Sequence, residues 1–160
     1  MLGSVARKLR MLGFDTLYLK DISDDDLLDI GTSQNRLILT CDKELFRRTI
    51  KIEANQVLLQ GSDDVENLVH ILSKYGIYSV KFHPVNSRCS TCNGTMKRIK
   101  PKDTNGLAPT NVLKRHKVFY VCKECGKLYW EGSHITSFRL TVKKLNSKLK
   151  ERRSGSQSKL

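Results

Sequence analysis

The stretch RCSTCNG at residues 88–94, together with VCKECGK at residues 121–127, decides how this chain is organised. Each stretch has two cysteines separated by two residues, so both sulfurs of a pair can face one ion. Because 29 residues lie between the two pairs, more than in a compact site, the spacing predicts a ribbon with an extended hairpin. Four thiols are the ligand set of a structural zinc ion. The predicted zinc ligands are Cys89, Cys92, Cys122 and Cys125.

Residues that tolerate a left-handed backbone follow both cysteine pairs. Asn93 and Gly94 follow the first pair, and Gly126 follows the second, where a metal-binding knuckle turns back on itself. Disulfide bonding is the alternative for four cysteines in a small secreted chain. No charged start with an apolar run and a small-residue cleavage site precedes them, so we expect zinc and a reducing compartment, the cytoplasm.

The composition is that of a globular chain with a strong basic excess. Its 160 residues, 39% of them hydrophobic, suffice for one ordinary domain and a small metal-bound one. No apolar run approaches the ~18 residues of a membrane span, so we expect a soluble protein that does not contact membranes. The formal net charge of +13 points to a polyanionic partner, most often nucleic acid.

The charge is divided unevenly between the two halves. Residues 1–80 contain 10 Lys and Arg against 12 Asp and Glu, a net of −2, whereas residues 81–160 contain 19 against 4, a net of +15. A near-neutral half with clustered carboxylates beside a basic half is typical of an active-site module joined to a substrate-binding module. The alternative is that the basic residues only increase solubility.

Hydrophobic periodicity in the first half predicts alternating helices and strands. On the first predicted helix, Arg7, Lys8 and Arg10 fall on the face opposite the apolar residues. The alternation predicts a parallel α/β sheet with right-handed crossovers. We expect helices at residues 1–12, from 24 after the N-cap Ser23, at 43–48 and up to 75 after a cap formed by Ser62, Asp63 and Asp64, and strands at 14–19, 36–40 and 56–60.

Carboxylates follow two of these predicted strands. Asp42 comes directly after the strand at 36–40, and a run of acids at residues 24–26 follows the strand at 14–19. Ligands of parallel sheets bind beyond the carboxyl ends of the strands, so these acids are candidates for holding Mg²⁺ or Mn²⁺. Each also has a structural alternative. Acids in the first turn of a helix interact favourably with the helix dipole, and Asp42 can be the N-cap of the helix that follows it.

The basic half contains the candidate RNA contacts. The stretch at residues 96–117 predicts a poorly packed loop that contacts phosphates, with plain solvent exposure as the alternative. An aromatic pair and a histidine after it can contact RNA, although support of the ribbon is the commoner role. No base-reading helix is evident, which argues against double-stranded DNA. The candidate RNA-binding residues are Lys97, Arg98, Lys100, Lys114, Arg115, Tyr129, Trp130 and His134.

An apolar stripe predicts a helix near the C-terminus, with one packed face and one face turned to phosphate. The stripe consists of Phe138, Val142, Leu145 and Leu149. Residues 151–160 lack core-forming content, so we expect a flexible basic tail there. The predicted domains are an α/β domain at 1–80, a zinc ribbon with a basic insertion at 81–134, and a basic helix with a flexible tail at 135–160.

Two blocks, in order along the chain, carry a family resemblance. The first comprises MLGSVARKLRMLGFD at residues 1–15 and RLILTCD at residues 36–42. The second is the ribbon, with RCSTCNG at residues 88–94 and the cysteines and aromatic residues of 119–134. Over residues 1–140 the chain resembles the PIN-like ribonuclease domain at the C-terminus of Mut-seven exonucleases.

The resemblance implies a PIN-like α/β fold with a zinc ribbon, and RNA cleavage that depends on a cluster of acids and on Mg or Mn. Asp24 matches the family's acid ahead of the second helix, with Asp25 as the fallback if the register shifts by one. Asp42 matches the acid of the family's Thr-x-Asp motif, and Cys41 stands where the family commonly has Arg.

The resemblance also implies an incomplete sheet. Family members open with a strand that ends in an aspartate directly before the segment matched here by Met1. Either the natural protein is longer than this sequence and contains that strand, or the first strand is missing and a partner covers the truncated sheet. Two functions follow. The first is a metal-dependent endoribonuclease; the alternative is a catalytically degenerate zinc-ribbon protein that binds ribosomal RNA in the ribosome.

Overall fold

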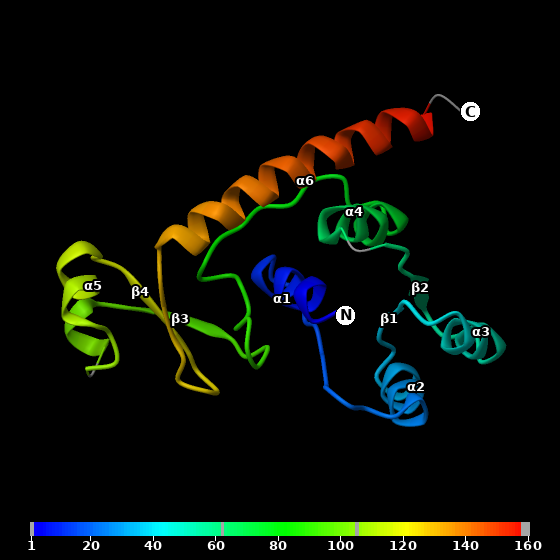
Figure 1. The fold of residues 1–160 in the computed structure, drawn as a ribbon, viewed down its shortest axis with the longest axis horizontal. Coiled ribbons are helices and arrows are strands. Elements are labelled where there is room, and N and C mark those ends of the chain that lie inside the picture. The colour runs from blue at the N-terminus through cyan, green and yellow to red at the C-terminus, as the bar shows by residue number, and fades with distance from the viewer. Residues whose placement is uncertain (1, 62, 105, 158–160) are drawn as a thin grey trace.

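Helix α1 lies at the centre of the molecule, between an α/β body and a three-stranded ribbon, and the long helix α6 passes over both (Figure 1). The structure is a computed structural model and describes residues 2–61, 63–104 and 106–157. Its elements are α1 (Gly3–Met11), α2 (Asp24–Ser33), β1 (Ile38–Thr40), α3 (Lys43–Lys51), β2 (Gln56–Leu58), α4 (Asp64–Lys74), β3 (Met96–Ile99), the 3-10 helix η1 (Pro101–Thr104), α5 (Thr110–Arg115), β4 (Phe119–Cys122), β5 (Leu128–Trp130) and α6 (Ser133–Gln157).

The body contains the predicted parallel pairing. Strands β1 and β2 pair in parallel with Leu39 opposite Val57, and helix α3 connects them. The expectation of a mixed α/β fold with a parallel sheet is therefore confirmed, with two strands in the part of the sheet that the structure describes. No helix within residues 2–61, 63–104 and 106–157 is long and apolar enough to cross a bilayer.

Side-chain caps fix where the body's helices begin. The Ser23 hydroxyl accepts from the backbone N–H of Asp26 at 3.1 Å, as predicted for the start of α2. Asp63 is the N-cap of α4 and accepts from the N–H of Val65 at 2.7 Å. Of the other two predicted cap residues, Asp64 is the first residue of the helix and Ser62 lies outside the described residues.

Residues 14–19 do not form the predicted strand. Their alternating pattern suits a strand, but no described segment pairs with them, and an extended segment becomes a strand only beside another one. Leu17, Tyr18 and Leu19 instead remain 44%, 42% and 47% exposed.

The main core lies between α1, α4 and α6. The predicted apolar stripe of α6 is buried there, at most 8% exposed, together with Val5 of α1 and Leu68 and Leu72 of α4, which are at most 2% exposed. Residues 151–157, expected as a flexible tail, continue the α6 helix, and residues 158–160 lie outside the described part. The helix continues past the stripe because each further residue of a helix that has already formed adds one backbone hydrogen bond. This step does not require an apolar side chain.

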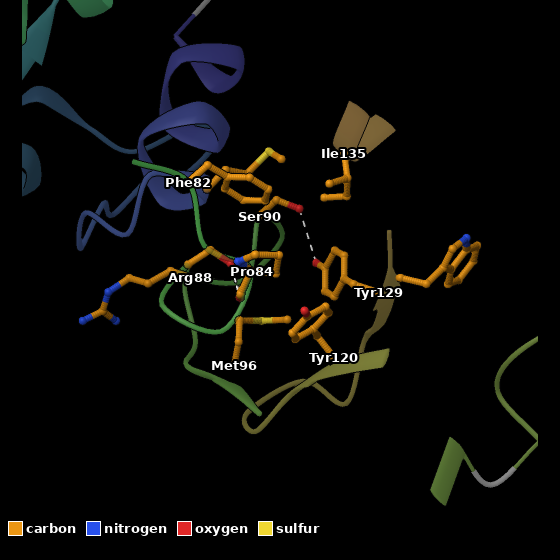
Figure 2. Close-up of a pocket in the computed structure, with 11 residues that line it drawn as sticks. Phe82, Pro84, Arg88, Ser90, Met96, Tyr120, Tyr129 and Ile135 are labelled. Carbon is orange, nitrogen blue, oxygen red and sulfur yellow. Dashed lines mark hydrogen bonds between the residues drawn. The ribbon is translucent and has the colours of Figure 1, made fainter. Parts of the chain in front are cut away.

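The ribbon is an antiparallel sheet in the order β3-β4-β5. Residues 96–117 were predicted to be a poorly packed loop. This is wrong for β3, which pairs with β4 along its whole length. It is also wrong for η1 and α5, which are helical. The inward side chains Met96, Tyr120 and Tyr129, one from each strand, face a small pocket of about 50 Å³ next to Phe82 and Ser90 (Figure 2).

Arg10 joins α1 to the ribbon. The sequence pattern placed it on the polar face, yet it is only 5% exposed. Its Nε donates to the carbonyl oxygen of Thr16 at 2.8 Å, and its Nη1 donates to those of Ser90 and Thr91 at 3.2 and 3.1 Å. Ser90 and Thr91 lie between the first two cysteines, so one buried guanidinium holds the cysteine knuckle against the body.

Replacing Arg10 with alanine tests this contact. We expect Arg10→Ala to lower the free energy of unfolding by about 2–4 kcal/mol, because three carbonyl oxygens lose a buried charged donor. Urea denaturation measures the change. Arg7 is exposed on the same helix, and Arg7→Ala should change stability by less than about 0.5 kcal/mol. Equal effects of the two substitutions would contradict the assigned role of Arg10.

Candidate metal centre and nucleic-acid interface

The four predicted cysteines converge at the end of the ribbon next to α1. Their Sγ atoms all lie within 4.8 Å of one another, and the separations are 3.7 Å for Cys89 and Cys125 and 3.4 Å for Cys92 and Cys122. Zn–S bonds of ~2.3 Å in a tetrahedron place neighbouring sulfurs ~3.8 Å apart, whereas a disulfide needs ~2.05 Å. All four cysteines are free, so they can hold a metal ion such as zinc.

Backbone turns behind the sulfurs give both knuckles their shape. Asn93 and Gly126 adopt φ angles of +69° and +71°, which confirms the left-handed turns expected after each pair. Gly94 is required for a different reason. A Cβ added there would lie 2.8 Å from the Cys122 sulfur and closer still to Glu124. Only glycine therefore leaves room for the second knuckle beside the first.

Cys89 is prepared for metal ligation by its surroundings. Burial raises the pKa of its thiol, but the Tyr129 hydroxyl at 3.0 Å and backbone N–H groups more than offset burial and lower that pKa to about 6. Burial raises the pKa of Tyr129 itself, so its phenol stays protonated and donates. Since the thiolate is the form that binds metal, Cys89 presents a ligand near neutral pH. Tyr129, a candidate base-stacking residue, has its hydroxyl at this site.

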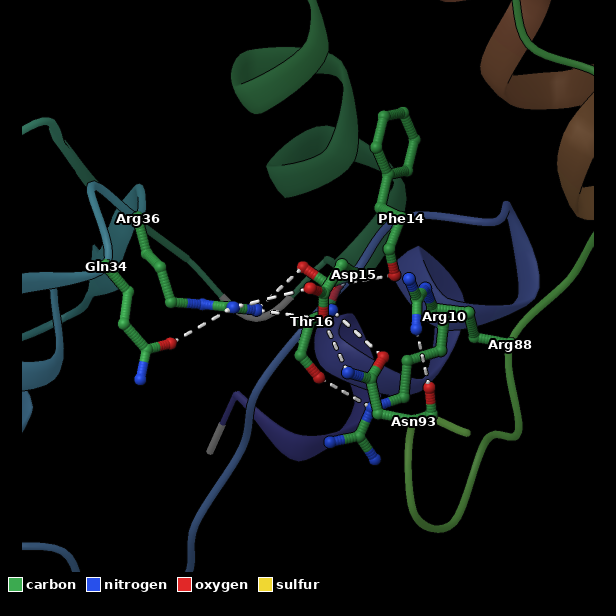
Figure 3. Close-up of polar contacts among 8 residues, drawn as sticks. All are labelled: Arg10, Phe14, Asp15, Thr16, Gln34, Arg36, Arg88 and Asn93. Carbon is green, nitrogen blue, oxygen red and sulfur yellow. Dashed lines mark hydrogen bonds and ion pairs between the residues drawn. The ribbon is translucent and has the colours of Figure 1, made fainter. Parts of the chain in front are cut away.

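A polar network links the first knuckle to the body beside β1 (Figure 3). Asn93 Nδ2 donates to Asp15 Oδ1 at 2.6 Å, and Arg36 Nη2 contacts the same oxygen at 2.9 Å. Hydrogen bonds from Arg36 and Asn93 hold the pKa of Asp15 below its usual value. Sequence reasoning missed this network and the burial of Arg10, because these polar residues gave no local signal of their distant partners.

The three candidate catalytic acids do not form a comparable cluster. Asp42 caps α3 by accepting from the backbone N–H groups of Glu44 and Leu45, at 2.6 and 3.0 Å. Arg48 contacts both Asp24 and Asp25. Among the residues described, only the four cysteines gather as three or more side chains able to bind one ion. Carboxylate oxygens suit Mg²⁺ or Mn²⁺ chemically, but as placed these three do not complete a site for either ion.

Two of the acids nevertheless share one cavity. Asp24, at the start of α2, and Asp42, after the carboxyl end of β1, both line a large cavity of about 900 Å³ between α1, α2 and β1. This is the edge of the sheet at which the sequence placed the candidate site. The structure thus brings Asp24 and Asp42 to one cavity, but it does not gather three acids there around one point.

The candidate RNA-binding residues lie on the ribbon and the helices next to it. Trp130 and Tyr129 are half-buried on β5, whereas the charged residues and His134 are exposed. Lys97 and Arg98 lie on β3, Lys100 follows it, Lys114 and Arg115 lie on α5, and His134 is in the first turn of α6. The segments β3 and α5, which carry most of these basic residues, lie at the end of the molecule away from the α/β body (Figure 1).

Metal analysis of two cysteine variants tests the centre. We expect the wild-type chain to bind about one zinc ion, and Cys89→Ser to lose it together with thermal stability, because three thiolates leave the tetrahedron incomplete. The fifth cysteine, Cys41, lies outside the cluster, so Cys41→Ser is the matched control and should keep its zinc. The centre would be refuted by equal zinc content in the two variants.

Comparison with known proteins adds the family. The Mut7-C RNAse domain matches residues 1–142 of the chain, a range that includes the body, the ribbon and the first part of α6. No curated protein matched, and no solved structure matched. The match confirms the resemblance drawn from the two sequence blocks. It covers most of the 160 residues, and the chain therefore belongs to the Mut7-C RNAse domain family.

Proposed function

We propose that this chain is an RNA-binding ribonuclease with a PIN-like α/β body and a structural zinc ribbon. The observation that carries the proposal is the family match over body and ribbon together. It is supported by Asp24 and Asp42 lining one cavity beyond the carboxyl end of β1. In parallel sheets this is the edge where ligands bind.

The zinc ribbon is proposed to bind the RNA. A zinc with four thiolates has no open coordination position, so its role is to fix the ribbon's shape. The exposed residues Lys97, Arg98, Lys114 and Arg115 project from that shape, in the half of the chain with a net charge of +15. Cations on a fixed surface attract phosphates and release counterions, which favours polyanion binding without base specificity.

The body is proposed to carry the cleaving acids Asp24, Asp25 and Asp42. A bound Mg²⁺ or Mn²⁺ would supply water activation and charge neutralisation at the phosphodiester. As placed, however, Asp24 and Asp25 are engaged by Arg48, and Asp42 Oδ1 accepts two backbone hydrogen bonds. No step is therefore assigned to an ion in this arrangement.

The same contacts favour a second candidate function, RNA binding without cleavage. Each of the three acids already has a structural partner, and these are the structural roles that the sequence offered as alternatives. In that case the ribbon and α6 would bind RNA, and structured RNA of the ribosome is the proposed target because recognition would rest on phosphate contacts.

Cleavage of labelled RNA in manganese decides between the two functions, with Asp42→Asn as the test variant. Asparagine caps helices about as well as aspartate, so the variant should fold normally while losing the carboxylate charge. If the chain is a nuclease, we expect the wild type to cleave and Asp42→Asn to lose at least about 100-fold in rate. Intact RNA with both proteins, while both still bind it, would exclude the nuclease and support the second function.

RNA affinity as a function of salt tests the ribbon. We expect the double variant Lys97→Ala, Arg98→Ala to bind single-stranded RNA more weakly, with a salt slope smaller by about 1.4 because two phosphate contacts are lost. Lys20 and Lys51 are exposed on the body, so replacing both with alanine removes the same charge elsewhere. If that control weakens binding as much, net charge rather than the ribbon surface determines affinity.

A further inference from the structure

A small pocket opens where the ribbon meets α1, α6 and the segment at residues 82–90 (Figure 2). We call it the ribbon pocket. It shares no lining residue with the cavity of Asp24 and Asp42, so it is separate from the candidate cleavage site. Most of its wall is aromatic or contains sulfur, and the side chains of these kinds are Phe82, Tyr120, Tyr129, Trp130, Met11 and Met96.

The aromatic walls are held in place by contacts outside the pocket. The Tyr129 hydroxyl contacts the sulfur of the first cysteine at 3.0 Å, and the Tyr120 hydroxyl donates to the carboxylate of Glu131 at 3.3 Å. The Phe82 ring packs edge-on against the buried Phe138, with ring centroids 5.1 Å apart. Because these rings are already fixed, a ligand that enters does not have to order them, which lowers the entropic cost of binding.

The ribbon pocket has the size of one flat ring. The centre of a water molecule can occupy about 50 Å³ of it. Since ~10–15 Å³ of such space holds one water, which itself fills ~30 Å³, the pocket accommodates roughly 100–150 Å³ of ligand. A pyrimidine base, a single six-membered ring, fits this range with room to spare, whereas the two fused rings of a purine take up all of it.

The charges around the ribbon pocket favour a ligand that carries phosphate. Arg88 lines the pocket, and its Nη1 donates to an uncharged backbone carbonyl at 3.1 Å. Arg98 is exposed and lies directly opposite Tyr120 in the β3–β4 pairing, so its side chain leaves the same face of the sheet. The nearby acid Glu131 is already paired with Arg139 at 2.8 Å. Cations beside aromatic rings are the combination that binds single-stranded nucleic acid.

We propose that the ribbon pocket binds one unstacked pyrimidine base of single-stranded RNA, with Arg98 contacting a phosphate next to that base. The base stacks on the aromatic wall, which requires that it is free of its neighbours and excludes a base within a duplex. The proposal rests on the proposed RNA binding and adds a preference for pyrimidines at one position of the bound strand. It is independent of whether the protein cleaves RNA.

The only tryptophan of the chain, Trp130, lines the ribbon pocket and reports on its occupancy. The probes are an RNA hexamer of uridine and one of adenosine, which carry the same phosphates. They are used without added Mg²⁺ or Mn²⁺, so that cleavage does not interfere. We expect the uridine hexamer to bind about fivefold more tightly by fluorescence anisotropy of a 5′ label. The unlabelled uridine hexamer should quench Trp130 fluorescence over the same concentration range.

Two substitutions of Ile135 change the size of the pocket in opposite directions. Ile135 is half-buried in the first turn of α6 and lines the pocket. We expect Ile135→Phe to fill the space and weaken binding of the uridine hexamer about fivefold. Ile135→Ala widens the space and should strengthen binding of the adenosine hexamer. Adenosines also stack on one another, but this cost is the same for every variant. Circular dichroism and zinc content check that both variants fold.

A matched pair of cations on β3 tests the phosphate contact. Arg98 leaves the sheet on the face of the ribbon pocket, whereas Lys97 lies opposite Val121 and leaves it on the other face. Both side chains are exposed, so each alanine substitution removes one cation from the same strand. We expect Arg98→Ala to weaken binding of the uridine hexamer about threefold more than Lys97→Ala does. Equal effects would contradict the assigned role of Arg98.

The outcomes separate this proposal from the proposed function. If neither hexamer binds to the wild-type chain, both are overturned. If RNA binds but leaves Trp130 fluorescence unchanged, only the base pocket is overturned, and RNA binding by the ribbon stands. The same holds if the ratio of uridine to adenosine affinity is equal in the wild type and in both folded Ile135 variants. The wild-type fluorescence decides the matter even if a variant does not fold.

Discussion

The convergence of four sulfurs on one point is the constraint on which the ribbon depends. The ribbon's own buried cluster consists of Cys89, Met96, Tyr120 and Cys122, which is too small to hold three short strands alone. Two of its four members belong to the four-cysteine cluster that can hold a metal ion, so this cluster and the core of the ribbon overlap. The Tyr129 hydroxyl and the space left by Gly94 complete the knuckles.

The knuckle also determines how the two halves of the molecule meet. Arg10 donates to carbonyl oxygens within the first cysteine pair, and Asn93 of the same knuckle contacts Asp15 and thereby Arg36. These contacts place the ribbon against α1 and beside the start of β1 (Figure 3). The exposed basic residues of the ribbon are thus held at a fixed position relative to the cavity that Asp24 and Asp42 line, which is the arrangement that the proposed function requires.

Local patterns in the sequence predicted what is local in the fold. The Ser23 cap, the apolar stripe of α6 and the turns at Asn93 and Gly126 depend on neighbouring residues, and the structure confirms them. Pairing is not local, so residues 14–19 were predicted as a strand although no described partner lies beside them. Arg10 was placed on the polar face because helical periodicity does not show that the ribbon covers that side. Asp24 and Asp42 line one cavity beside β1, and the Asp42 cap of α3 was one of the two roles that the sequence offered. The sequence could not show that Arg48 contacts Asp24, because this contact depends on how distant segments pack.

X-ray absorption at the zinc edge of the purified wild-type chain tests the central claim most directly. The account predicts one zinc environment with four sulfur ligands at about 2.3 Å and no nitrogen or oxygen ligand. A spectrum with fewer than four sulfurs, with mixed sulfur and nitrogen or oxygen ligands, or with no zinc signal would contradict it. The ribbon would then need another source of rigidity, and a zinc centre could no longer explain why its basic surface has a fixed position.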